Sequence, residues 1–73
     1  MTAIKWVVVF HRDYEDQDNF QEIIERADEL GQLNIPIKLV ITENETGSGE
    51  RVVNLLVPQK HFIESAKKIF GWA

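Results

Sequence analysis

Few residues in this sequence have side chains that could do chemistry. The chain has two histidines, His11 and His61, no cysteine, and serines only at Ser48 and Ser65. A catalytic triad needs a nucleophile, a histidine and an orienting acid, and these positions give no argument for such a group. We therefore expect a protein that is not an enzyme, with no catalytic residues and no cofactor.

A metal site is the next possibility, because His11 stands close to Asp13, Glu15 and Asp16. The acidic run that follows His11 lacks the glycine and the terminal glutamate of a calcium-binding loop. The two glycines beside Ser48 lack the lysine of a phosphate-binding loop. The sequence therefore predicts neither a specific metal site nor a phosphate site.

The most strongly charged segment runs from residue 13 to residue 29. It contains eight acids and one arginine, a net charge of −7 in a chain whose total is −4. Its candidate acidic face consists of Asp13, Glu15, Asp16, Glu22, Glu25 and Glu29. Such a face could imitate the phosphates of a nucleic acid, or it could be a solvated helix surface whose early acids suit the helix N-terminus. Direct binding of nucleic acid is not expected, because no basic patch with exposed aromatic residues is present.

Apolar spacing predicts the helices that position these groups. Residues 18–31 form an amphipathic helix, with Asp18 as the N-cap, Asp16 as a second candidate, and Gly31 at the end. Its apolar stripe contains Phe20, Ile23, Ile24, Ala27 and Leu30. A second helix begins at Pro58 and ends at Gly71, and its apolar stripe contains Phe62, Ile63, Ala66, Ile69 and Phe70.

Three runs of β-branched and aromatic residues predict strands over 4–10, 35–42 and 51–57, with a loop over 43–50. Alternation divides each strand between two faces. The residues expected to face the helices are Ile4, Trp6, Val8 and Phe10; Ile35, Ile37, Leu39 and Ile41; and Val53, Leu55 and Val57.

The order strand, helix, strand, strand, helix predicts one α+β domain over residues 1–73. Pro36 cannot donate to a sheet ladder, so the second strand should lie at an edge and the third between the other two. The expected fold is a β-α-β-β-α two-layer sandwich: a three-stranded mixed sheet of order 1-3-2 with both helices on one face. This topology resembles a ferredoxin-like βαββαβ fold that lacks its last strand.

An incomplete sheet of this kind predicts a partner. The first strand would leave an apolar edge unpaired, and the face turned away from the helices would carry apolar side chains. The candidate partner interface consists of Trp6, Val7, Val9, Val40, Val52 and Leu56. We expect a homodimer or a complex with another protein.

These features favour a small non-catalytic protein–protein interaction or regulatory module that self-associates through the sheet face or the first-strand edge. One alternative is an acidic, nucleic-acid-mimicking inhibitor of a basic target protein. Another is a designed protein with no biological function. Because the chain has no long apolar run, no signal-peptide pattern and no cysteine, we expect a cytoplasmic protein that does not contact a membrane.

Overall fold

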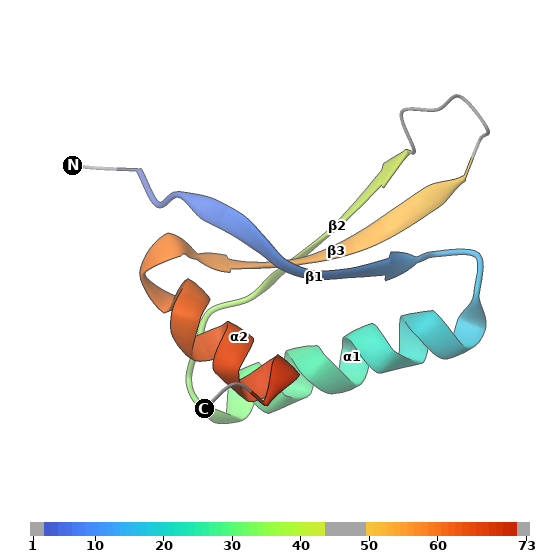
Figure 1. Cartoon of the computed structure of the whole chain (residues 1–73). Coiled ribbons are helices and arrows are strands. Elements are labelled where there is room, and N and C mark those ends of the chain that lie inside the picture. The colour runs from blue at the N-terminus through green and yellow to red at the C-terminus, as the bar shows by residue number, and fades with distance from the viewer. Residues whose placement is uncertain (1–2, 44–49, 72–73) are drawn as a thin grey trace.

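The computed structural model describes residues 3–43 and 50–71 of the chain, so most of the predicted loop over 43–50 lies outside the described residues. The elements are β1 (Trp6–Asp13), α1 (Gln17–Gln32), β2 (Lys38–Glu43), β3 (Arg51–Pro58), the 3₁₀ turn η1 (Gln59–His61) and α2 (Phe62–Phe70). The strands form one sheet of order β1-β3-β2. Both helices lie against the same face of this sheet (Figure 1). The predicted α+β class and the predicted strand order are confirmed.

The sheet is antiparallel at both of its interfaces, so the prediction of a mixed sheet is wrong. β3 lies between the other strands and pairs antiparallel with each of them. β1 and β2 therefore run in the same direction, as a crossover through α1 requires, but they are not neighbours. Because ladder type is defined by neighbouring strands, no parallel ladder forms.

One extra residue in β1 changes which side chains that strand turns toward the helices. Val8 lies opposite Leu56 and Phe10 lies opposite Leu55, so Val9 is the extra residue of a β-bulge. A bulge interrupts the period of two. Val9 and Phe10 are consequently both buried in the core, with exposed fractions of 6% and 5%, whereas Val8 is 44% exposed.

Because of the bulge, the predicted faces of two pairs of residues in β1 are wrong. Trp6 and Val8 were expected to face the helices with Phe10, and both lie on the other side of the sheet. Val7 and Val9 were expected on that other side, but Val7 packs against the core and Val9 belongs to it. A single inserted residue moves the side chain of every preceding residue of the strand to the opposite face of the sheet, because side chains alternate along a strand.

α1 is confirmed as the amphipathic helix, with different residues at its ends. Asp16 is the N-cap, and its side chain accepts hydrogen bonds from the backbone N–H groups of Asp18 (2.9 Å) and Asn19 (3.4 Å). Gly31 lies inside the helix. The left-handed residue that follows is Asn34, at φ 61°, because asparagine also tolerates this conformation.

The helices bury less of the sheet than the sequence predicts. The core joins Ile23, Ala27 and Leu30 of α1 to Val53, Leu55 and Val57 of β3. The described helices pack against β1 and β3, and all six residues of β2 are exposed. Of the predicted core face of the second strand, Ile35 alone is buried, and it precedes β2.

α2 contacts the core through its small residues, through Ile69, and through the ring of Phe70, whose centre lies 5.9 Å from that of Phe10. Ser65 and Ala66 are buried and Ile69 is half-buried, whereas Phe62, Ile63 and Phe70 of the predicted stripe are exposed. The small side chains of Ser65 and Ala66 allow the helix backbone to approach the sheet closely. Gly71 ends the helix in the left-handed conformation at φ 68°, as predicted.

Candidate protein interface

The sheet face opposite the helices, here called the open face, has apolar side chains from all three strands. Val53, Leu55 and Val57 are buried under the helices, so the alternating residues of β3 lie on the open face. Strand register then places their neighbours there too. The apolar members of the open face are Trp6, Val8, Val40, Val52 and Leu56.

Four of the six residues predicted for a partner interface lie together on this face: Trp6, Val40, Val52 and Leu56. The placement of Val7 and Val9 there is wrong, because the bulge turns both toward the core. Val8 is the open-face residue that the sequence argument missed. No local sequence signal marks the bulge, since valine occupies positions 7, 8 and 9 alike.

Polar contacts fix the side chains at two places on the open face. The Lys38 Nζ lies 4.9 Å from the centre of the Trp6 ring, in a cation–π contact that spans β2 and β1. Asn54 of β3 donates from Nδ2 to the Val40 carbonyl oxygen at 3.1 Å and to the Thr42 Oγ1 at 3.0 Å. These contacts help to hold β2 in a defined position beside β3.

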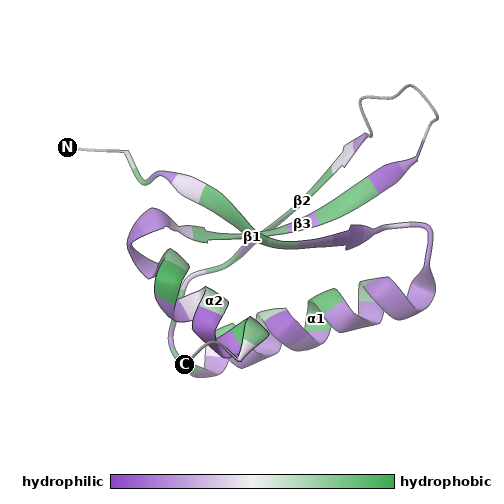
Figure 2. Cartoon of the chain, in the orientation of Figure 1, coloured by the Kyte–Doolittle hydropathy of each residue, from purple (hydrophilic) through white to green (hydrophobic). Residues whose placement is uncertain are grey.

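β2 carries exposed apolar side chains on both sides, two on the helix side and Val40 between Lys38 and Thr42 on the open face. Leu39 and Ile41 point to the helix side, opposite the buried Leu55 and Val53, but they are 41% and 49% exposed. Val40 points to the open face and is 37% exposed. The hydropathy colouring shows hydrophobic residues in β2 (Figure 2). The sequence predicted the apolar residues of this strand and missed that they are uncovered.

The flank of α1 that is turned away from β1 carries an exposed apolar side chain, that of Ile24. Glu22 forms a 3.0 Å ion pair with Arg12 of β1, so its flank of the helix faces β1. Ile24 lies about 200° around the helix from Glu22, on the flank turned away from β1, and is 39% exposed. Together, Ile24, Leu39 and Ile41 line an uncovered apolar strip on the helix side of the sheet.

The edge formed by β1 is less suited to pairing than the edge formed by β2. The bulge at Val9 interrupts its ladder, and bulges and charged residues both discourage pairing of an edge strand. The second half of β1 is polar, with His11, Arg12 and Asp13, and this half is coloured hydrophilic in Figure 2. β2 has a regular register throughout its six residues.

The residues of the predicted acidic face are largely engaged by arginines and by the helix terminus. Asp13 accepts a hydrogen bond from the Glu15 N–H at 3.0 Å, and Asp16 caps α1. The ion pairs are Arg12–Glu22 at 3.0 Å, Arg51–Glu15 at 3.3 Å, Arg26–Glu29 at 3.2 Å and Arg26–Glu25 at 3.7 Å. Arg12 and Arg51 come from the sheet, so the charge of this surface is less negative than the segment over residues 13–29 indicates.

His11 does not assemble a site with the acids that follow it. It lies opposite Asn54 on the open face, whereas Asp13 and Asp16 make the local turn and cap contacts described above. Within residues 3–43 and 50–71, no group of three or more histidine and acidic side chains could hold a metal ion.

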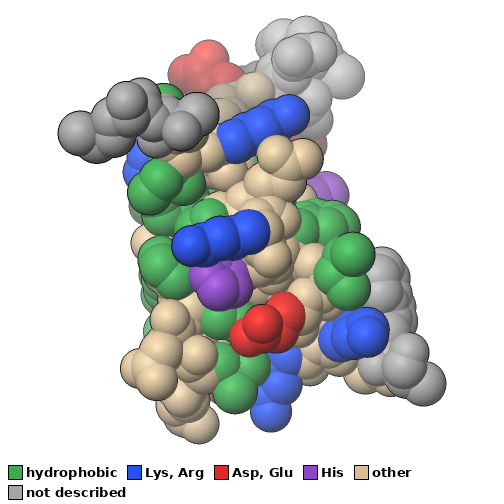
Figure 3. Space-filling model, turned by 90° about the vertical axis from the view of Figure 1, so that its left-hand side faces the viewer, with side chains coloured by type: hydrophobic (Ala, Val, Ile, Leu, Met, Phe, Trp, Pro, Cys, Tyr) green, Lys and Arg blue, Asp and Glu red, His purple; other side chains and the backbone are tan. Residues whose placement is uncertain are grey.

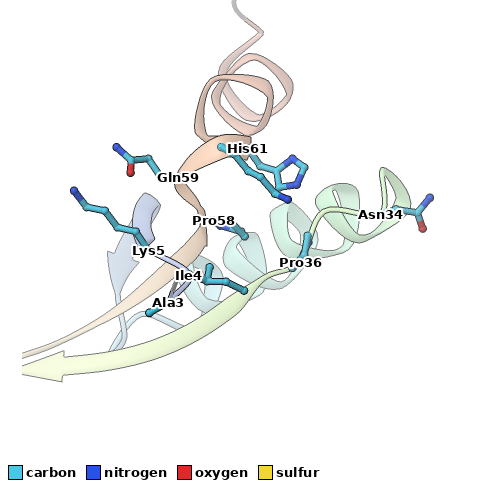
Figure 4. A pocket seen from close by; sticks show the side chains of 9 residues that line it. Ala3, Ile4, Lys5, Asn34, Pro36, Pro58, Gln59 and His61 are labelled. Atoms are coloured by element: carbon cyan, nitrogen blue, oxygen red, sulfur yellow. The ribbon is translucent and has the colours of Figure 1, made fainter. Parts of the chain in front are cut away.

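A groove of about 750 Å³ opens at the end of the sheet where η1 follows β3. Its lining combines the apolar residues Ile4, Pro36 and Pro58 with the polar residues Lys5, Asn34, Gln59, Lys60 and His61 (Figure 4). Seen from this end, basic side chains lie among apolar and histidine side chains, and acidic ones are less frequent (Figure 3).

No helix in the described part of the chain is long and apolar enough to cross a membrane. Neither a family model, nor a curated protein, nor a solved structure matches the chain, so its geometry is the basis for any proposal about its function.

Proposed function

We propose that this protein is a small non-catalytic module that works by binding protein, and that it associates with itself through the uncovered parts of its sheet. One observation carries the proposal. The described helices pack on β1 and β3 from one side, so the open face and both sides of β2 keep apolar side chains in contact with water.

The size of this uncovered surface supports association. The exposed apolar side chains on the helix side of the sheet, those of Ile24, Ile37, Leu39 and Ile41, present roughly 300 Å², comparable with the largest apolar patch of a typical monomer. Burial at about 25 cal/mol/Å² would contribute on the order of 7 kcal/mol before the costs of association. A domain of this size has a comparable free energy of unfolding, so such a contact could govern its state in solution.

The hypothesis of an acidic inhibitor has less support than this proposal. A mimic of nucleic acid needs unpaired charges spaced along a surface, and Glu15, Glu22 and Glu29 are each within 3.3 Å of an arginine nitrogen. The proposal also includes the topology of the fold and the location of the protein. The element order and the β1-β3-β2 sheet support a ferredoxin-like arrangement without its last strand, and the lack of cysteine fits a cytoplasmic location.

Sedimentation velocity from low to high micromolar concentration tests the self-association. The expected result is a reversible increase in mass from the 8.5 kDa monomer toward a dimer. A monomer that persists at high micromolar concentration would overturn the proposal of self-association. Addition of salt is a useful control, because an apolar contact keeps its strength in salt whereas pairing between charged surfaces is screened.

A further inference from the structure

We infer that β2 pairs antiparallel with β2 of a second copy, with Val40 of one chain opposite Val40 of the other, to make a continuous six-stranded sheet. This inference rests on the proposed self-association and names the surface, the partner and the register. It differs from packing of two open faces, which would leave β2 unpaired at an edge.

The choice of edge follows from the difference between β1 and β2. Among the described residues these strands are the two edges of the sheet. β1 is interrupted by the bulge at Val9 and is charged in its second half. β2 is regular, and its central residues Leu39, Val40 and Ile41 are exposed and apolar. An exposed, flat and apolar edge strand is the type that pairs with another chain.

The symmetry of the pairing follows from the direction of the strands. Two identical edge strands that pair antiparallel are related by a two-fold axis perpendicular to the sheet, and such an interface is closed and self-complementary. This axis keeps the helices of both copies on the same side. Directly opposite residues of an antiparallel pair share a face, so the residue numbers of opposite partners differ by an even number.

The register centred on Val40 matches the side chains best. It sets Leu39 of each chain opposite Ile41 of the other chain. The exposed apolar residues on the helix side of the two chains therefore contact each other. This register also sets Lys38 opposite Thr42 and Ile37 opposite Glu43, so no like charges face each other.

The two neighbouring registers are less favourable. Centring on Ile41 sets Glu43 opposite Leu39, so Leu39 loses its apolar partner; the register centred on Val40 pairs Leu39 with Ile41 and sets Glu43 opposite Ile37, at the end of the ladder. Centring on Leu39 sets Lys38 opposite Val40 and brings Pro36, which has no N–H, into the ladder.

The pairing also extends the apolar strip on the helix side. Leu39 and Ile41 of both chains would become neighbours at the centre of the sheet, with Ile24 of each α1 beside them. An edge contact of seven residues per chain buries roughly 800 Å² in total, at the low end of specific interfaces. The dimer is therefore expected to be reversible, with a micromolar dissociation constant.

Matched lysine variants separate this interface from the open face. We expect the double substitution Leu39→Lys and Ile41→Lys to raise the dissociation constant at least tenfold, and Val8→Lys to leave it within twofold. All three side chains are 41–49% exposed, so the monomer should tolerate each lysine, and circular dichroism checks this. If Val8→Lys dissociates the protein and the double variant does not, β2 pairing is wrong and association through the open face stands. If the wild-type protein is monomeric, the proposed function fails together with this inference.

Cysteine cross-linking tests the register directly, because the chain has no cysteine of its own. The Cβ atoms of directly opposite residues lie about 5 Å apart, so Val40→Cys should form a disulfide-linked dimer under mild oxidation. Thr42→Cys is the matched control on the same face, with its two copies about 13 Å apart in this register. Faster cross-linking of Ile41→Cys or Leu39→Cys than of Val40→Cys would overturn the register, and equal cross-linking of Thr42→Cys would overturn the pairing.

Discussion

Asn54 of the central strand donates a hydrogen bond from its side-chain amide to the backbone oxygen of Val40, 3.1 Å away on the neighbouring strand. The same nitrogen lies 3.0 Å from the hydroxyl oxygen of Thr42. β2 has no cover from the described helices, so this amide is a principal tie, besides the ladder itself, between β2 and the rest of the domain.

Substitution Asn54→Ala should lower the free energy of unfolding by about 1 kcal/mol, the usual net value of a hydrogen bond in a partly exposed site. Urea denaturation at a concentration where the protein is monomeric measures the change. Thr42→Val is the companion variant, because it removes one of the two acceptors on β2 and retains the shape of the side chain. It should cost less than Asn54→Ala, and a larger cost would mean that the Thr42 hydroxyl, rather than the Val40 carbonyl, is the important acceptor.

Two adjacent isoleucines of α1 should respond very differently to the same substitution. Ile23 is fully buried and Ile24 is 39% exposed. Ile23→Ala removes side-chain volume from the core and should cost about 2–5 kcal/mol, enough to unfold a large fraction of a small domain. Ile24→Ala should cost less than about 1.5 kcal/mol, because much of its side chain already contacts water. Equal decreases in the free energy of unfolding, measured by thermal or urea denaturation, would show that the buried side of the helix is assigned incorrectly.

The bulge in β1 makes an equally clear prediction for neighbouring valines. Val9→Lys places a charged group in the core and should prevent stable folding. Val8→Lys should change the melting temperature little, because Val8 is 44% exposed on the open face. A regular strand without the bulge would put Val8 under the helices with Phe10, and lysine at position 8 would then be the damaging one. Circular dichroism melts of the two variants distinguish these arrangements.

The N-cap of α1 can be tested in the same paired way. The Asp16 carboxylate accepts hydrogen bonds from two backbone N–H groups of the first turn, so Asp16→Ala should destabilise the protein by about 1 kcal/mol. Asp18 lies within that turn and makes a favourable contribution only through the helix dipole, so Asp18→Ala should cost less. If Asp18→Ala is the more destabilising substitution, the helix begins two residues later than described.

The parts of the fold that were predictable from the sequence are those with a strong local period. Ile23, Ala27 and Leu30 recur at helical spacing, and Val53, Leu55 and Val57 alternate as a central strand should; all six are buried. The helix ends were less predictable, because Asp16 and Asp18 are both good caps, and both Gly31 and Asn34 tolerate the left-handed conformation that follows a helix.

Two features of the candidate interface could not be predicted, for different reasons. The bulge at Val9 lies in a run of three valines, where no side chain indicates that the alternation is interrupted. The exposure of Leu39 and Ile41 depends on where α1 lies over the sheet, and the alternation within β2 is the same with or without a helix above it. The open-face residues Val52 and Leu56 were placed correctly, because the central strand has no irregularity in its burial pattern.

The interruption in β1 also limits how large an assembly of this protein can become. If both borders of the sheet accepted another chain, copies could add one after another without end and form a filament. The β1 edge, which has the bulge and charged residues, does not accept another chain, whereas the regular β2 edge does. One copy can therefore be added, and growth then stops. The extra residue Val9 therefore makes a finite complex, rather than a fibre, the expected product at high concentration.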